Sequence, residues 1–199
     1  LEKAETEIFR AAIAESLRVM MWLGDIDAEQ NNLFNGLLKL TDIYPCKEVD
    51  FSDSGWHPDM AVDFLLGLWN NADVRLRALK NEGNLAYFVT SEIYDAYEHY
   101  LDQLGGDSAY VELVGGRRVL HYHGIPVIDM NISHIIPEGS SPRCILTDRR
   151  NLVLAVNASD YPGAEVRMWY NPDEMENRQR AVFMVGCEIL DEQLLVMAD

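Results

Sequence analysis

The fold is decided by two stretches of this chain, GIPVIDM at residues 124–130 and RCILTDRRNLVLAVN at residues 143–157. The first predicts a short strand, and the second predicts two apolar strands, over 143–148 and 151–157. Pro137 and Gly139 lie between the two stretches and indicate a loop. Further alternating or apolar runs at 165–170 and 181–190 predict two more strands.

The residues before Gly124 continue the pattern. A short β-forming run at 85–89 precedes a helix that Thr90 or Ser91 can cap and that ends near Leu104, before Gly105-Gly106. Two further apolar runs, at 110–114 and 117–123, flank Gly115-Gly116. Two adjacent glycines can both adopt positive φ, so these runs predict a β-hairpin.

Two helices are expected in the first eighty residues. Apolar side chains recur at helical spacing over 2–23, and Gly24 is expected to end that helix. Pro58 sits at a first-turn position, and the apolar stripe that follows extends to Leu79. The segment 25–55 is interpreted as turns and loop. Helices and strands therefore occur in blocks, which favours an α+β fold over a regularly wound parallel sheet.

Composition narrows the class of protein. The chain has 199 residues, of which 48% are hydrophobic, so it can bury a substantial core. Its 16 basic and 33 acidic residues give a formal net charge of −17, which disfavours binding to a phosphate backbone. Cys46, Cys144 and Cys187 are widely spaced in apolar sequence and are expected to be buried thiols. No apolar run is long enough to predict a membrane span.

The histidines are the first candidate site. On an ideal strand His121 and His123 share one face, about 7 Å apart. With Asp129 or His134 nearby, they could hold a metal ion. Zinc sites need three or four converging ligands, and no cysteine or histidine lies at a diagnostic short spacing. We therefore interpret His121 and His123 as surface or strand-edge residues.

Other candidate sites are weaker. Cys144 or Cys187 could pair with a distant histidine, but neither lies in a signature that would lower a thiol pKa. Gly105-Gly106 and Gly115-Gly116 lack the Lys-Ser/Thr that follows a phosphate-binding loop and are interpreted as turns. The sequence therefore predicts no catalytic, cofactor-binding or metal-binding residue.

Two dense charged patches allow two interpretations. One is formed by Asp148, Arg149 and Arg150, and the other follows Asn171-Pro172. The second patch contains Asp173, Glu174, Glu176, Arg178 and Arg180. A solvated face is the ordinary interpretation, and ion pairing at a subunit interface is the alternative.

The order of these segments resembles the C-terminal two-thirds of tailed-phage major capsid proteins with the Hong Kong 97-type fold. The motifs that carry the resemblance are YFVTS at 87–91, GIPVI at 124–128, CILTD at 144–148 and NLVLAV at 151–156. The acidic and apolar segment 182–198 is similar to a late strand of the family. Residues 9–23 would match the end of its long spine helix.

The resemblance implies a fold with a spine helix and mixed or antiparallel sheets. It divides the chain into a peripheral part with the spine helix (1–54), an axial domain (55–180) and a return strand (181–199). The family's amino-terminal arm and extended loop would precede Leu1. Its final strand is expected beyond Asp199.

The implied function is that of a non-enzymatic structural subunit of an icosahedral phage or prophage capsid, forming hexamers and pentamers around the genome. Its partners would be copies of itself, with scaffolding, portal or decoration proteins as further candidates, and it would show no specific nucleic-acid or membrane binding. It would be found in the virion and, before assembly, in the host cytoplasm. The alternatives are an encapsulin-like shell around enzymes, a small intracellular metal-dependent enzyme using His121, His123 and Asp129, and an accessory module that oligomerises.

Overall fold

The computed structural model describes residues 2–51, 56–105, 110–112, 118–136, 141–157 and 164–198. The chain forms two compact units. Unit 1 contains Leu1–Leu40 and Val153–Glu188, and unit 2 contains Thr41–Leu152 and Ile189–Asp199. Each unit is therefore built from segments that are distant in the sequence.

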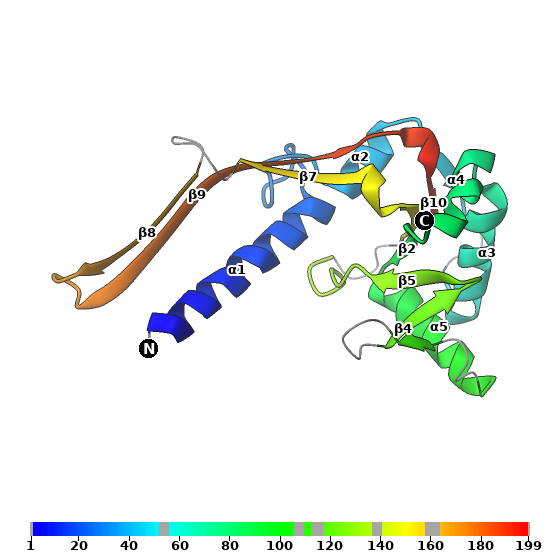
Figure 1. Ribbon diagram of the computed structural model, residues 1–199, viewed down its shortest axis with the longest axis horizontal. Coiled ribbons are helices and arrows are strands. Elements are labelled where there is room, and N and C mark those ends of the chain that lie inside the picture. The colour runs from blue at the N-terminus through cyan, green and yellow to red at the C-terminus, as the bar shows by residue number, and fades with distance from the viewer. Residues whose placement is uncertain are drawn as a thin grey trace. The chain divides into compact units, whose positions relative to one another are not determined.

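Helices are concentrated in the first half of the chain (Figure 1). The α-helices are α1 (Glu2–Leu23), α2 (Leu37–Ile43), α3 (Ala61–Asn71), α4 (Val74–Ala78) and α5 (Ser91–Gln103). Short 3-10 helices are η2 (Pro58–Met60), η3 (Leu79–Glu82), η5 (Arg149–Asn151) and η6 (Glu192–Leu194).

The strands form two sheets. The first contains β1 (Lys47–Val49), β2 (Leu85–Val89), β3 (Tyr110–Glu112), β4 (Arg118–Tyr122), β5 (Ile125–Asp129), β6 (Cys144–Asp148) and β10 (Leu195–Ala198). The second contains β7 (Leu152–Asn157), β8 (Ala164–Asn171) and β9 (Glu176–Ile189).

The seven-stranded sheet lies in unit 2 and has the order β1-β10-β6-β2-β5-β4-β3. The pairs β1/β10 and β2/β5 are parallel, and the other pairs are antiparallel. Mixed pairing is what an α+β fold allows, so the predicted fold class is confirmed. The pairing of β3 with β4 confirms the predicted hairpin, whereas Gly115-Gly116 lies outside the described residues.

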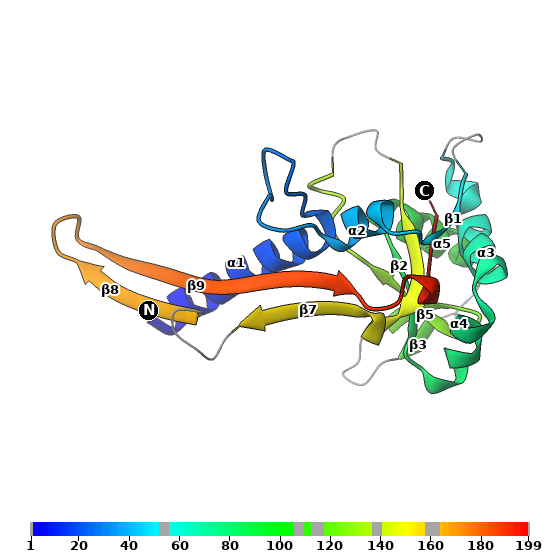
Figure 2. The ribbon, with the colours of Figure 1, turned by 90° about the horizontal axis from the view of Figure 1, so that it is seen from above.

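The core of unit 2 lies between this sheet and the helices α3 and α5 (Figure 2). Strand β6 is buried along its whole length, including its polar last residues Thr147 and Asp148. On α3 the buried side chains recur at helical spacing and include Phe64, Leu65 and Leu68. Fully burying one such side chain contributes about 1.5–3 kcal/mol. This apolar burial is what stabilises unit 2.

Unit 1 combines α1 with the three-stranded sheet β7-β9-β8. Strand β9 is the longest strand described and pairs antiparallel with β8 from Ala164↔Phe183 to Asn171↔Glu176. Along the second half of β9, the odd-numbered side chains are partly covered, whereas most even-numbered ones are exposed. The sheet therefore has one covered face and one solvent-facing face.

The predicted helix after Pro58 is interrupted. It begins as the 3-10 turn η2, continues as α3, and stops at Ala72, whose ψ of 140° is not helical. Asp73 then starts α4, because its side chain accepts a hydrogen bond from the Arg75 backbone N–H. An Asp at an N-cap position competes with helix continuation, which explains the break.

One prediction at another position was wrong. Segment 25–55, interpreted as turns and loop, contains α2 and β1. A separate strand, β10, follows the acidic residues Asp191 and Glu192 and pairs with β1 and β6. Both β1 and β10 are short strands, so local sequence alone defines them poorly.

The boundaries of the two units also differ from the predicted division into 1–54, 55–180 and 181–199. Segment 153–180 belongs with α1 in unit 1, because β7 and β8 both pair with β9. The identification of these units with peripheral and axial domains remains a prediction.

Candidate assembly surface

His121 and His123, considered above as possible metal ligands, do not lie on one strand face. His121 lies on β4 and its Nδ1 contacts the Val119 carbonyl oxygen at 2.8 Å. His123 has left the strand: its φ is 52°, and together with Gly124 it forms the turn between β4 and β5. Its ring stacks on Tyr122 at 4.3 Å. The assumption of an ideal strand through His123 was therefore wrong.

Asp129, the third proposed ligand, is already engaged. Its carboxylate accepts hydrogen bonds from Ser91 Oγ at 3.0 and 3.1 Å and from the Asn131 backbone N–H at 2.8 Å. His134 lies on an exposed turn further along the chain. Within the described part of the chain, no group of three or more His, Cys, Asp or Glu residues is arranged to hold a metal ion.

The cysteines have the environments of structural thiols. Cys144 on β6 is fully buried, and burial raises its pKa well above the ordinary value. Burial, with a smaller effect from Glu188, raises the pKa of Cys187 to about 11, and its thiol donates to the Asn35 carbonyl oxygen at 3.0 Å. Burial also raises the pKa of Cys46. A nucleophilic cysteine requires the opposite shift.

The first charged patch stabilises the chain locally. Arg150 binds Asp148 through its backbone N–H at 2.8 Å and through its guanidinium at 2.7 Å, and it also reaches Glu82 at 2.8 Å. The hydrogen bond from the Arg150 side chain is the main reason why the pKa of Asp148 is lowered. This patch therefore links β6 and η5 to η3.

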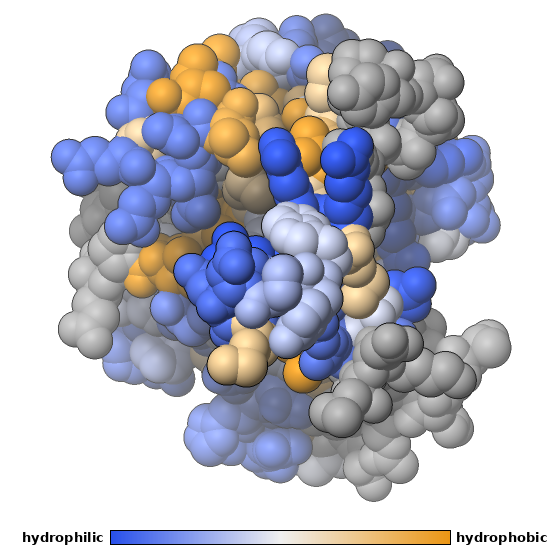
Figure 3. All heavy atoms as spheres, turned by 90° about the vertical axis from the view of Figure 1, so that its left-hand side faces the viewer, coloured by the Kyte–Doolittle hydropathy of each residue, from blue (hydrophilic) through white to orange (hydrophobic). Residues whose placement is uncertain are grey.

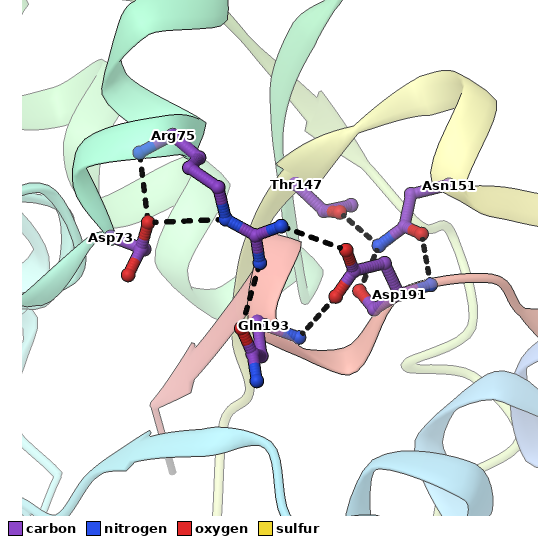
Figure 4. Close-up of polar contacts among 6 residues, drawn as sticks. All are labelled: Asp73, Arg75, Thr147, Asn151, Asp191 and Gln193. Atoms are coloured by element: carbon purple, nitrogen blue, oxygen red, sulfur yellow. Dashed lines mark hydrogen bonds and ion pairs between the residues drawn. The ribbon is translucent and has the colours of Figure 1, made fainter.

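A polar network that the sequence did not predict lies next to the first charged patch (Figure 4). The buried Asn151 donates to Thr147 Oγ1 at 3.1 Å and to the Asp191 carbonyl oxygen at 2.9 Å, and it accepts from the Asp191 backbone N–H at 2.8 Å. Arg75 contacts the Asp191 carboxylate at 3.4 Å and Gln193 at 2.8 Å. The network joins α4, β6, η5 and η6 within unit 2.

The second charged patch lies at the end of the β8–β9 hairpin, and we call residues 167–180 the hairpin end. Arg178 forms ion pairs with Glu174 and, at 2.7 Å, with Glu176. These contacts hold the turn between the strands together. Figure 3 shows the molecule from the side on which this turn lies, where hydrophilic side chains surround smaller hydrophobic groups.

The hairpin end also exposes an unusual amount of apolar surface. Met168, Trp169, Tyr170 and Met175 are between 45% and 81% exposed. Contiguous apolar patches on a protein surface commonly mark sites of protein association. In unit 1, α1 approaches the sheet face that carries Tyr170 and its strand partner Asn177, where Asn177 Nδ2 donates to Glu5 Oε2 at 3.3 Å. The hairpin end is therefore the candidate assembly surface of the described residues.

The spine-like helix α1, the mixed sheet of unit 2 and the long β8–β9 hairpin together form the Hong Kong 97-type capsid fold. Similar solved structures are the holo-SrpI encapsulin complex from Synechococcus elongatus PCC 7942 (TM-score 0.58, 17% identity) and the satellite phage P4 procapsid including the size determination (Sid) protein (TM-score 0.55, 10% identity). A structure of Mycobacterium phage Che8 has a TM-score of 0.51 and 14% identity. The fold that the resemblance implied is thus confirmed.

These similarities extend over most of the chain. They cover 99% of it for the encapsulin, 100% for the P4 procapsid and 80% for the Che8 structure. The chain spans 63%, 65% and 54% of those proteins in the same order. No protein-family model matches the sequence. No curated protein matches it either.

No helix among the described residues combines the length and apolar character needed to cross a membrane.

Proposed function

We propose that this protein is a structural subunit of a closed icosahedral shell, built from hexamers and pentamers of identical copies. The observation that supports this most strongly is the capsid-type fold shared over nearly the whole chain with the P4 procapsid and an encapsulin. The exposed apolar hairpin end supports it independently, because such a surface suits a subunit buried among its neighbours. The protein acts through its interfaces and has no catalytic role.

Expression of the native protein, including any residues before Leu1 or after Asp199, tests this proposal. Electron microscopy of the purified particles is expected to show closed shells or rings of subunits. Mass photometry of the same sample measures the distribution of assemblies. A native protein that remains monomeric over the whole accessible concentration range would refute the shell function.

Within this function, a phage or prophage capsid around a genome is the primary proposal. It is supported by the similarity to the P4 procapsid and to the Che8 structure. The net charge of −17 would keep the inner surface from adhering to DNA, so that the genome stays mobile. The particle would be a virion, assembled in the host cytoplasm, and scaffolding, portal or decoration proteins would be its partners.

An encapsulin-like compartment is the second candidate, and the similarity to the SrpI complex favours it. The content of purified particles distinguishes the two. Nuclease-protected DNA inside the shell supports the capsid, whereas a stoichiometric enzyme released on disassembly supports the compartment. Genes for terminase, portal and protease next to the coding sequence would also favour the capsid.

A further inference from the structure

Two cations of unit 2 are held on a single tryptophan ring. Arg77 Cζ lies 5.9 Å from the centre of the Trp69 ring, and Lys80 Nζ lies 5.1 Å from it. Arg77 also donates a hydrogen bond to the Asn70 carbonyl oxygen. A cation near the face of an aromatic ring is attracted to it, so these contacts fix both charges in place. We call Trp69, Arg77 and Lys80 the cationic surface.

The charge of the cationic surface is not balanced by a carboxylate. Within the described residues, neither Arg77 nor Lys80 forms an ion pair. A guanidinium has five N–H donors, so Arg77 keeps donors for a further acceptor after its bond to Asn70. Val74 lies three residues before Arg77 on the same side of α4 and is 79% exposed. The surface therefore offers two fixed positive charges beside an exposed apolar side chain.

Helix α5 carries the opposite charge. Its sequence, SEIYDAYEHYLDQ, contains several carboxylates and no lysine or arginine. Glu92 and Asp95 are exposed and lie on neighbouring turns of one face, and Glu92 accepts a hydrogen bond from Ser133 Oγ at 3.1 Å. No cation in the described part of the chain pairs with either carboxylate. Burial and the nearby carboxylates of Asp129, Glu98 and Glu92 raise the pKa of Asp95. We call Glu92 and Asp95 the α5 acidic pair.

The two surfaces lie too far apart to meet within one copy. Helix α5 packs against η2, which begins α3, whereas Trp69 lies near the end of α3, just before α4. A helix of 11 residues, the length of α3, spans about 16 Å. Figure 1 shows α4 at the top and α5 at the bottom of unit 2. The cations and these carboxylates can therefore form ion pairs only between different molecules.

Each surface carries an electrostatic cost that the other would offset. Arg77 and Lys80 repel each other beside the same ring, and Asp95 is surrounded by like charges. Bringing the surfaces together gives every one of these groups a neighbour of opposite charge. A guanidinium can bind a carboxylate through two parallel hydrogen bonds, which makes such a pair both strong and specific.

We propose that the cationic surface of one copy binds the α5 acidic pair of a second copy of this chain. The inference rests on the proposed shell function, which brings many copies together, and it names the residues of one contact between them. The contact joins two different surfaces, so it is heterologous and closes into a ring when the rotation between copies allows. Hexamers and pentamers are rings of this kind. A nucleic acid is a poorer occupant of the cationic surface, because the net charge of −17 repels phosphates.

The test is a charge exchange in the native protein. Lys80→Glu and Asp95→Lys are each expected to weaken self-association by about tenfold or more, because each places like charges across the contact. The double variant that carries both substitutions is expected to associate like the native protein, since the exchanged charges attract each other again. Sedimentation velocity over a series of concentrations measures all four proteins.

Two further variants separate this contact from general effects. Asp95→Asn removes one carboxylate from the cluster with Asp129 and Glu98, so its unfolding temperature is expected to stay the same or rise while self-association weakens. A residue that only stabilised the fold would lower both. Arg10→Glu makes the same change in net charge as Lys80→Glu at an exposed position of α1, and it is expected to leave self-association unchanged. Thermal unfolding of every variant verifies that it is folded.

Each outcome decides the inference. Native-like association of both single charge variants would overturn the contact and leave the shell function standing. The contact is also overturned if the double variant does not regain association, or if Arg10→Glu weakens it equally. Binding of a short DNA duplex that Lys80→Glu abolishes, with association unchanged, would identify a nucleic acid as the occupant instead. A native protein that never associates would refute the shell function and, with it, this contact.

Discussion

At the scale of single residues, Asn151 makes the polar contacts that join distant parts of unit 2. Only 4% of Asn151 is exposed, and its side chain bonds to Thr147 and to both backbone groups of Asp191. Arg75 extends the network to Asp191 from α4. Removing a buried amide with several partners is costly, because each partner loses a hydrogen bond that water cannot replace at a buried site.

We therefore expect Asn151→Ala to lower the free energy of unfolding by about 2–4 kcal/mol. Urea denaturation followed by circular dichroism measures this loss. Asn70→Ala is the matched control, because Asn70 is exposed on α3, and it is expected to change stability by less than about 0.5 kcal/mol. Equal effects of the two substitutions would show that the network does not stabilise the fold.

The pair Asp148 and Arg150 makes stability depend on pH. The hydrogen bond from Arg150 lowers the pKa of the Asp148 carboxyl below 3.8, so the folded state favours the carboxylate more than the unfolded state does. The resulting stabilisation is complete above about pH 4 and is lost as the pH falls through the lowered pKa.

The difference in unfolding free energy between the native protein and Asp148→Asn is therefore expected to narrow below about pH 4. Denaturation curves recorded between neutral and strongly acidic pH measure it. Asp102→Asn, which removes an exposed carboxylate on α5, should show no comparable narrowing. A constant difference for Asp148→Asn across the whole range would contradict the ion pair.

At the scale of elements, the end of α1 depends on two glycines in close contact. The Gly36 backbone N–H donates to the Gly24 carbonyl oxygen at 2.6 Å. A Cβ atom on Gly24 would lie 2.4 Å from the Phe34 carbonyl oxygen, and one on Gly36 would lie 2.5 Å from the Gly24 nitrogen. These neighbours are backbone atoms, so they cannot move aside without displacing the chain.

Gly24→Ala and Gly36→Ala are each expected to destabilise unit 1 by about 2 kcal/mol or more, or to prevent its folding. Gly186→Ala on β9 is the control, because no atom lies within 4 Å of its added Cβ, and it is expected to be neutral or slightly stabilising. Thermal unfolding monitors all three. Wild-type stability in Gly24→Ala would show that the two segments do not approach so closely.

At the scale of the whole molecule, the two units differ in how deeply their strands are buried. In unit 2, β2, β6 and β10 consist almost entirely of buried residues, whereas the hairpin end of unit 1 is largely exposed. Regions with few buried apolar contacts open locally at low free energy. The units are therefore expected to differ in local stability.

Hydrogen exchange measured on the unassembled protein is expected to be slowest in β2, β6 and β10 and several orders of magnitude faster in β8. Under assembly conditions, protection should increase at the hairpin end if neighbouring copies cover it. Equal exchange rates in β6 and β8 of the unassembled protein would contradict the difference in burial.

The sequence by itself determined most of the local structure. Helix α1, the strand β2 feeding α5, and the runs that form β5 to β8 and the second half of β9 follow from apolar periodicity and from neighbouring capping or turn residues. The first half of β9, from Glu176, was interpreted only as a charged patch. The order of these elements was also sufficient to indicate the capsid-type fold. The break at Asp73 and the turn at His123 were missed because a small local preference decided each of them.

The tertiary structure alone decided how distant segments combine. It paired the short strands β1 and β10, grouped 153–188 with α1, and joined Arg75 to Asp191 across 116 residues of sequence. It also placed Arg167 opposite Arg180 and left Met175 in the β8–β9 turn exposed. Periodicity records only which side of an element is apolar, whereas the choice of partner depends on strand register and on contacts between residues far apart in the chain.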